Sequence, residues 1–187
     1  MENIFDILNQ FATISEDAKV ELLKIISIKK IEKGSIVLHQ GNICRNLYFI
    51  KSGFVRGFYN QDGKEITSWF AFENEPFTSM YSFVSQKYSL ENLEILEDSV
   101  LYDISYENLQ LLFKKYSEFN LIGRLLIEKY YIELEERTIS LQFQSAKERY
   151  QNIIDNQPQL LQKASLGMIA SYLGISQETL SRIRNKI

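Results

Sequence analysis

The pattern of apolar residues changes once along this chain, and that change constrains the fold more than any other feature. Before residue 105, short runs rich in β-branched and aromatic residues alternate with glycine and other turn residues. After Tyr106 the apolar residues recur at steps of three and four, which is the period of an α-helix. Strands and helices that occupy separate parts of a chain are typical of an α+β protein. We therefore predict a sheet domain followed by helices.

The first part of the chain reads as one capped helix and seven strands. A serine followed by acidic residues and helical spacing predicts a helix over 15–26. The segment Asn60-Gln-Asp-Gly63, between two β-type runs, predicts a hairpin. Several short strands at this pitch favour a sandwich or a jelly-roll barrel with an aromatic core. The expected strands cover residues 25–32, 35–40, 46–51, 53–60, 64–72, 88–96 and 99–104.

Residues 117–143 are predicted to form one long helix, capped by Ser117, with no proline and only Gly123 to interrupt it. Its apolar residues form two stripes, and a helix with two apolar faces must bury both. One stripe, Leu126, Tyr130, Leu134 and Leu141, is expected to pack on the barrel. The other predicts a parallel homodimer through the same helix of a second subunit; the alternative is one broad face buried within a single chain. The residues expected at the dimer seam are Ile122, Leu125, Ile132, Ile139 and Phe143.

The C-terminal segment has the spacing of a helix-turn-helix. Ser165 is expected to cap the first helix, Gly174 to end it with a positive φ, and Ser176 to cap the second. A helix that enters the major groove of DNA carries short polar residues outward and cations toward the phosphates. This predicts DNA as the partner, and an ordinary C-terminal surface helix is the alternative. The residues expected to face outward are Gln177, Glu178, Ser181, Arg182 and Asn185.

The charge of the chain is divided between its two ends. Residues 145–187 contain six Lys and Arg against three Asp and Glu, which leaves −6 on residues 1–144 because the whole chain carries −3. A small basic tip on an acidic body favours a site-specific regulator over a non-specific nucleic-acid coat.

Other classes of protein are disfavoured by what the sequence lacks. No apolar run approaches the roughly 20 residues of a membrane span, and the start lacks a basic leader region, so we expect a cytoplasmic protein. One cysteine and one histidine predict no metal, haem or iron–sulfur cofactor. The acidic pairs at 97–98 and 135–136 have no histidine or cysteine nearby in the sequence, so we do not expect an enzyme.

Four motifs follow one another in a familiar order. They are Asn-Leu-Tyr-Phe-Ile-Lys-Ser-Gly-Phe-Val at 46–55, Gly-Lys-Glu at 63–65, Ser-Ala-Lys-Glu-Arg-Tyr at 145–150 and Ile-Ala-Ser-Tyr-Leu-Gly-Ile-Ser-Gln-Glu-Thr-Leu-Ser-Arg-Ile-Arg at 169–184. With these motifs the chain resembles the Crp/Fnr family of bacterial transcription regulators over nearly its whole length. The resemblance implies a cyclic-nucleotide-binding-like jelly roll at 1–116, a dimerisation helix at 117–144 and a helix-turn-helix DNA-binding domain at 145–187.

The resemblance also implies roles for the second helix. Glu178, Ser181 and Arg182 match the base-reading pattern Glu-x-x-Ser-Arg of the family, which implies a palindrome with TGA-like half-sites. The chemistry agrees, because arginine can donate twice to guanine and glutamate can accept from cytosine. Gln177 stands where some relatives place a second base-reading arginine. The residues expected to position the DNA backbone are Thr179, Arg184, Asn185 and Lys186, and Ser165 is included among the DNA contacts.

The chain departs from the family pattern at its end and in its expected ligand site. It stops at Ile187 without the family's β-hairpin wing, which a wingless subfamily or a shortened chain would explain. A cyclic nucleotide needs close backbone N–H groups and a fixed cation for its phosphate. Residues 72–89 contain neither the Gly-Glu pair nor the arginine of the cyclic-AMP-binding members, and Glu73 and Glu75 would repel a phosphate. We therefore predict no cyclic AMP response.

Two alternatives remain open for the barrel and for the protein. The barrel either binds another small molecule, through Tyr81, Phe83 or Tyr88, or serves only as a platform for folding and dimerisation. The protein is either a DNA-binding regulator or a non-DNA sensor or dimeric interaction module whose DNA-binding domain has lost useful affinity.

Overall fold

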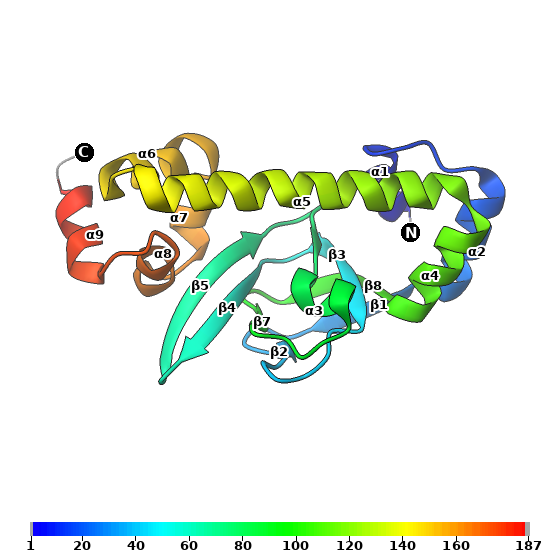
Figure 1. The fold of residues 1–187 in the computed structure, drawn as a ribbon, viewed down its shortest axis with the longest axis horizontal. Coiled ribbons are helices and arrows are strands. Elements are labelled where there is room, and N and C mark those ends of the chain that lie inside the picture. Colours follow the sequence, from blue (N-terminus) through cyan, green and yellow to red (C-terminus); the bar gives the residue numbers. More distant parts are fainter. Residues whose placement is uncertain (1, 186–187) are drawn as a thin grey trace.

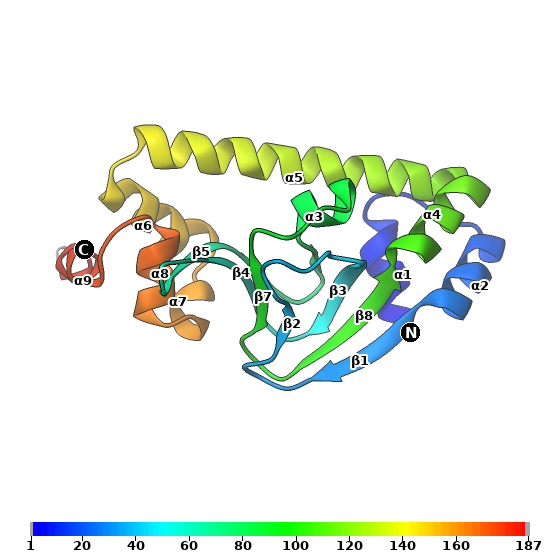
Figure 2. The same ribbon diagram turned by 60° about the horizontal axis from the view of Figure 1, so that its bottom comes forward.

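One long helix, α5 (Ser117–Phe143), runs along the molecule and joins its two ends (Figure 1). The computed structural model describes residues 2–185. The strands lie beside the first part of α5, and a cluster of short helices lies beside its end (Figures 1 and 2). The predicted α+β arrangement, with a sheet domain first and helices after it, is therefore confirmed.

The strands form two four-stranded antiparallel sheets that enclose the main apolar core. Their orders are β1-β8-β3-β6 and β2-β7-β4-β5, so β5 is an edge strand. Tyr48 and Phe77 stack inside the core with ring centroids 4.9 Å apart, and Trp69 lies 6.3 Å from Phe77. The strands are β1 (Ser27–Ile31), β2 (Ile36–Leu38), β3 (Asn46–Ser52), β4 (Val55–Gln61), β5 (Lys64–Ala71), β6 (Pro76–Phe77), β7 (Asn92–Ile95) and β8 (Ser99–Ser105).

The predicted hairpin turn joins β4 to β5. Asp62 and Gly63 both have positive φ, 53° and 80°, as a two-residue turn of the primed type requires. The pairing register then shifts between Gly57 and Phe58, which is a bulge in this edge hairpin. Glycine is required at position 57 because a Cβ there would lie 2.2 Å from the Trp69 ring.

The helices begin largely where their caps predict. The hydroxyls of Ser15, Ser145, Ser165 and Ser176 each accept the backbone N–H expected of an N-cap, and Ser145 completes a capping box with Glu148. The prediction for Ser117 is wrong: this serine is already helical, and the extended residue Tyr116 precedes it without a side-chain cap. The remaining helices are α1 (Glu2–Asn9), α2 (Glu16–Ile25), α3 (Met80–Ser85), α4 (Tyr106–Lys115), α6 (Ala146–Asn156), α7 (Leu160–Lys163), α8 (Leu166–Tyr172) and α9 (Gln177–Arg184).

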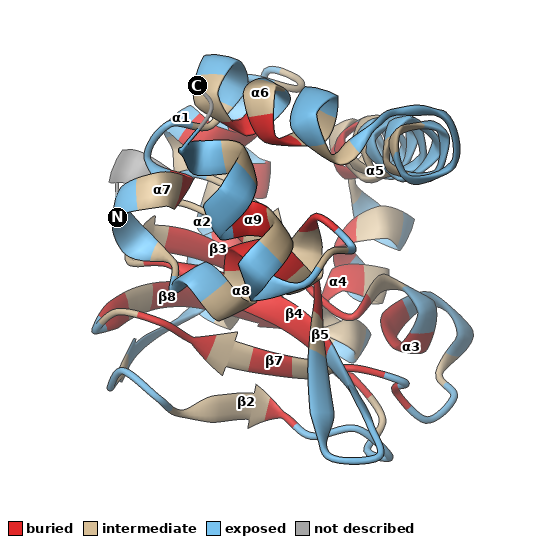
Figure 3. Ribbon diagram, turned by 90° about the vertical axis from the view of Figure 1, so that its left-hand side faces the viewer, coloured by how far each residue is buried: buried red, intermediate tan, exposed pale blue. Residues whose placement is uncertain are grey.

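A second apolar cluster holds the C-terminal helices together and reaches into the barrel. It includes Leu160, Ile169 and Leu180, and it also includes Phe54 and Leu96, which belong to the sheet domain. The inner sides of these helices are buried, whereas most of α5 is exposed (Figure 3). The C-terminal helices are therefore packed on the barrel as well as on each other.

Candidate nucleic-acid interface

Helices α8 and α9 form a compact helix-turn-helix. Gly174 has φ +66° and ends α8, as the sequence predicts, and the Ile175 N–H then donates to the Ala170 carbonyl at 3.0 Å. Leu180, on the back of α9, is 1% exposed. The two helices are thus one packed unit with α9 outermost.

Two arginines from neighbouring helices complete the end of α8. Arg137 of α5 donates to the Tyr172 carbonyl and lies over the Tyr172 ring at 4.1 Å. Arg149 of α6 donates through Nε to the Leu173 carbonyl at 2.9 Å. Both arginines satisfy carbonyls that a helix C-terminus leaves without a partner. The turn of the motif is therefore fixed to α5 and α6.

The outer face of α9 presents the side chains expected to read DNA. Thr179 is half-buried, because its N–H and hydroxyl both lie against the Ser176 hydroxyl at 3.2 Å. Lys186 lies outside the described residues. The exposed side chains are Gln177, Glu178, Ser181, Arg182, Arg184 and Asn185.

Glu178 on this face is held in a form that can accept hydrogen bonds. The Ser176 hydroxyl is the main cause that lowers the pKa of the Glu178 carboxyl, and Arg182 adds a smaller effect in the same direction. Glu178 is therefore an ionised acceptor at neutral pH. The Arg182 Nε donates to the backbone carbonyl of Glu178, one turn earlier on α9, at 3.3 Å.

Ser165 caps the start of α8, and Gln177 of α9 lies against the same turn. The Ser165 hydroxyl accepts from the Met168 N–H at 3.3 Å. A Cβ built on Gly167 would lie 2.5 Å from the Gln177 Nε2 atom, so Gln177 folds back over α8. The sequence predicted Gln177 as a free outward side chain. Gly167 was the available signal for its actual position, because a residue without a side chain leaves room for Gln177 over α8.

Helix α5 exposes most of the stripe expected at a dimer seam. Ile132, Ile139 and Phe143 are 56%, 48% and 78% exposed, and Leu125 is half-buried. Ile122 is different: it is 3% exposed and belongs to the core of its own chain. Ile122 is therefore removed from the predicted seam, because the barrel and α4 of its own chain already cover it.

The stripe expected to face the barrel divides into two parts. Leu126 and Tyr130 are half-buried, whereas Leu134 and Leu141 are 49% and 44% exposed. The strands lie beside only the first part of α5, whereas its end lies beside the C-terminal helices (Figure 1). Ile127 and Tyr131, which sequence reasoning missed, are also exposed and continue this second stripe with Leu134 and Leu141.

The three residues considered for a ligand pocket differ in their exposure. Tyr81 and Tyr88 are 53% and 70% exposed, whereas Phe83 is buried against Tyr106 with ring centroids 5.4 Å apart. Two surface cavities of the described residues are lined by other side chains, one by nine residues between Val37 and Tyr48 and one by Phe113 of α4 with residues of α5. A ligand pocket formed by these three residues stays a prediction.

A buried carboxylate inside the barrel was not found from the sequence. Glu91 is 7% exposed and accepts from the Trp69 Nε1 at 2.9 Å and from the Ser68 hydroxyl at 3.4 Å. Burial raises the pKa of Glu91, while hydrogen bonds from Ser79, Trp69 and Ser68 act in the opposite direction. Only the tertiary fold brings these groups together, since Trp69 lies on β5 and Glu91 lies in the loop before β7.

The described part of the chain offers two further observations. It contains no group of three or more His, Cys, Asp or Glu side chains placed to hold a metal ion. None of its helices combines the length and apolar character needed to cross a membrane.

Comparisons with known proteins agree with this geometry. Residues 28–116 match the cyclic nucleotide-binding domain family. No curated protein sequence matches the chain. Among solved structures, a Crp/Fnr family transcriptional regulator from Eubacterium rectale has a TM-score of 0.74 at 19% identity, covering 92% of this chain and 83% of that one.

Two further structures show the same fold. FixK2 from Bradyrhizobium japonicum has a TM-score of 0.73 at 18% identity, covering 87% of this chain and 84% of its own. The c-di-GMP-responsive global regulator CLP from Xanthomonas campestris has a TM-score of 0.71 at 20% identity, covering 92% of this chain and 91% of its own. The resemblance inferred from the motifs is confirmed at the level of the fold.

Proposed function

We propose that this chain, which contains a cyclic nucleotide-binding domain and has the fold of Crp/Fnr-type regulators, is a sequence-specific DNA-binding transcription regulator. One observation carries the proposal: α9 is packed through Leu180 while Glu178, Ser181 and Arg182 are exposed together on its outer face. Arginine can donate to guanine O6 and N7, and an ionised glutamate can accept from cytosine N4. These contacts support a half-site with a TGA-like core.

The proposed regulator is a homodimer that reads a palindrome. The exposed apolar residues of α5, among them Ile132 and Ile139, need a partner surface, and an identical helix supplies one by two-fold symmetry. Two recognition helices would then enter successive major grooves, about 34 Å apart. This role is regulatory, and the proposed mechanism requires no catalytic group.

We further propose that cyclic AMP is not its signal. Position 91 brings a buried carboxylate close to Ser79, the residue that precedes α3. Glu75 is half-buried, so a second carboxyl lies partly inside the same domain. The sole basic residue in the segment 72–89 is Lys87, and it is exposed. A phosphodiester bound by this segment would therefore meet carboxylates without a fixed cation from the segment itself. Calorimetry of the full chain with cyclic AMP tests this, and micromolar binding would contradict it.

The DNA-binding proposal is tested by removing the proposed base-reading pair. The double variant Glu178→Ala with Arg182→Ala should lose its preference for a duplex with TGA-like half-sites over a scrambled duplex, measured by fluorescence anisotropy. The matched control is Arg45→Ala with Glu107→Ala, an exposed ion pair between the residue before β3 and helix α4. If both double variants kept the same preference as the wild type, α9 would not read DNA, and a dimeric interaction module would be the better account.

A further inference from the structure

Apolar contacts attach the helix-turn-helix to the barrel within one shared cluster of buried residues. Phe54, just before β4, is fully buried and stacks on Phe70 and Phe72 with centroids 5.5 and 4.9 Å apart. Phe70 in turn meets the edge of the Tyr172 ring of α8 at 5.3 Å. The outer face of the β4–β5 hairpin is therefore covered by the C-terminal helices.

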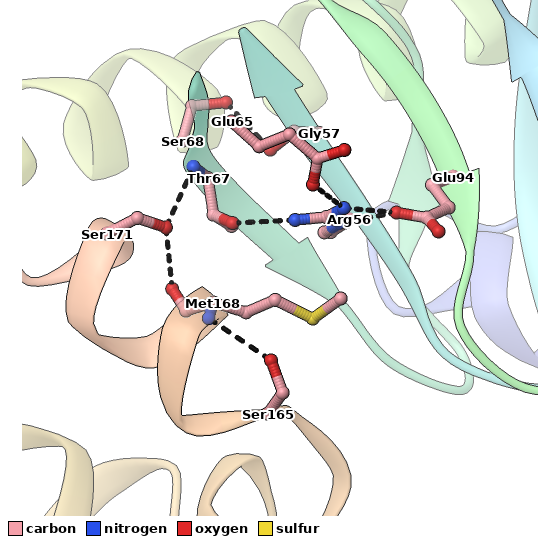
Figure 4. Close-up of polar contacts among 9 residues, drawn as sticks. All are labelled: Arg56, Gly57, Glu65, Thr67, Ser68, Glu94, Ser165, Met168 and Ser171. Carbon is pink, nitrogen blue, oxygen red and sulfur yellow. Dashed lines mark hydrogen bonds and ion pairs between the residues drawn. The ribbon is translucent and has the colours of Figure 1, made fainter. Parts of the chain in front are cut away.

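Polar contacts define the orientation of that attachment. The Thr67 N–H on edge strand β5 donates to the Ser171 hydroxyl of α8 at 3.2 Å, and Ser171 donates to the Met168 carbonyl at 3.0 Å (Figure 4). An ion pair also joins Lys163 of α7 to Glu97 at 2.5 Å. An apolar surface alone tolerates sliding, whereas a directional hydrogen bond to an edge strand fixes the register.

A buried arginine holds Thr67, the strand residue of the Thr67–Ser171 contact. Arg56 is 3% exposed and donates to Glu94 and Glu65, each at 2.5 Å. A third guanidinium nitrogen donates to the Thr67 hydroxyl at 3.3 Å. The side chain of Met168 extends from α8 toward this group (Figure 4). Arg56 thus ties three side chains of the sheet together at the residue that contacts α8.

The attachment leaves the reading face of α9 free. The barrel touches α7 and α8, whereas Glu178, Ser181 and Arg182 remain exposed. Because α8 and α9 pack as one unit through Leu180 and the Gly174 turn, a fixed α8 also fixes α9.

We propose that Arg56 is a positioning residue for DNA recognition, acting through Thr67 and Ser171 to hold α9 in its binding orientation. This inference rests on the proposed function. It assigns to the β4–β5 hairpin a direct role in orienting the recognition helix, in addition to that of the α5–α6 connection. Any change in the barrel that moved β5 would then move α9 without passing along α5.

Ser171→Ala is the first test, because it removes the acceptor while alanine favours the helix. One neutral hydrogen bond corresponds to about a 2- to 10-fold change in an equilibrium. We expect specific DNA binding to weaken by that factor and the Thr67 amide to exchange faster with deuterium by a similar factor. Ser171→Thr, which retains an acceptor, should restore both. The matched control is Ser85→Ala. The Ser85 hydroxyl has only local partners: it donates to the Tyr81 carbonyl and accepts from the Lys87 N–H.

Arg56→Gln tests the arginine itself. If Arg56 acts through Ser171, the double variant Arg56→Gln with Ser171→Ala should bind DNA no more weakly than the weaker single variant. Unchanged DNA affinity in Ser171→Ala despite faster Thr67 exchange would overturn the proposal, and tighter DNA binding would show instead that the attachment holds α9 back. If the wild type bound no DNA, the proposed function would fail, while Thr67 exchange in Arg56→Gln would still decide whether Arg56 holds the Thr67–Ser171 contact.

Discussion

Replacing Phe54 with alanine should show how strongly the barrel and the helix-turn-helix stabilise each other. Phe54 has no exposed surface and stacks on two phenylalanines, so the substitution leaves a cavity between β4–β5 and the C-terminal helices. Removal of a buried phenylalanine side chain costs about 3–5 kcal/mol. With a urea slope of about 2 kcal/mol per M, the unfolding midpoint should fall by roughly 2 M.

The assay is urea unfolding followed by circular dichroism and by the fluorescence of Trp69. Because the cavity lies between the two parts, the C-terminal helices should unfold before the barrel, and the two signals should separate. Tyr88→Ala is the control, since Tyr88 is 70% exposed and its loss should change stability by less than about 0.5 kcal/mol. A loss of less than about 1 kcal/mol in Phe54→Ala, with coincident signals, would refute the reasoning.

Three other substitutions test separate parts of the account. Ile132→Glu places a charge on the proposed seam and should shift the protein from dimer to monomer in analytical ultracentrifugation; if only Leu134→Glu did so, the seam would be the second stripe. Gly174→Ala puts a side chain at φ +66°, where it costs about 1–2 kcal/mol, and should lower the thermal midpoint by a few degrees; an unchanged midpoint would contradict the strain argument. Glu91→Gln should stabilise the protein at pH 7, because burial raises the pKa of Glu91 and a raised pKa means that stability is lost as the pH rises. The difference from the wild type should shrink as the pH falls toward the range of an ordinary carboxyl, and a difference that did not depend on pH would contradict the assignment.

Local signals in the sequence predicted much of the fold. Serine caps form hydrogen bonds within three residues, so Ser15, Ser145, Ser165 and Ser176 could be recognised without any tertiary information. The hairpin turn could also be predicted locally, because glycine readily adopts the positive φ that Gly63 has. The short elements β6 and α3 were missed, since two and six residues are too few to show a period.

The features that depend on contacts between distant residues could not be predicted. Both apolar stripes of α5 have helical spacing, and only the packed structure shows that Ile122 lies inside its own chain. The hydrogen bond from Thr67 to Ser171 joins residues 104 positions apart. Glu91 could not be singled out from the sequence, because its hydrogen-bond donor Trp69 comes from β5, whereas Glu91 lies in the loop before β7.

Selection from random duplex DNA by the purified full chain tests the central claim most directly. The salt concentration should be near physiological, so that counterion release does not present non-specific attraction as recognition. The account predicts enrichment of a palindrome with TGA-like half-sites whose centres lie about one helical turn apart. Recovery of no consensus sequence would contradict the claim that this protein is a site-specific DNA-binding regulator.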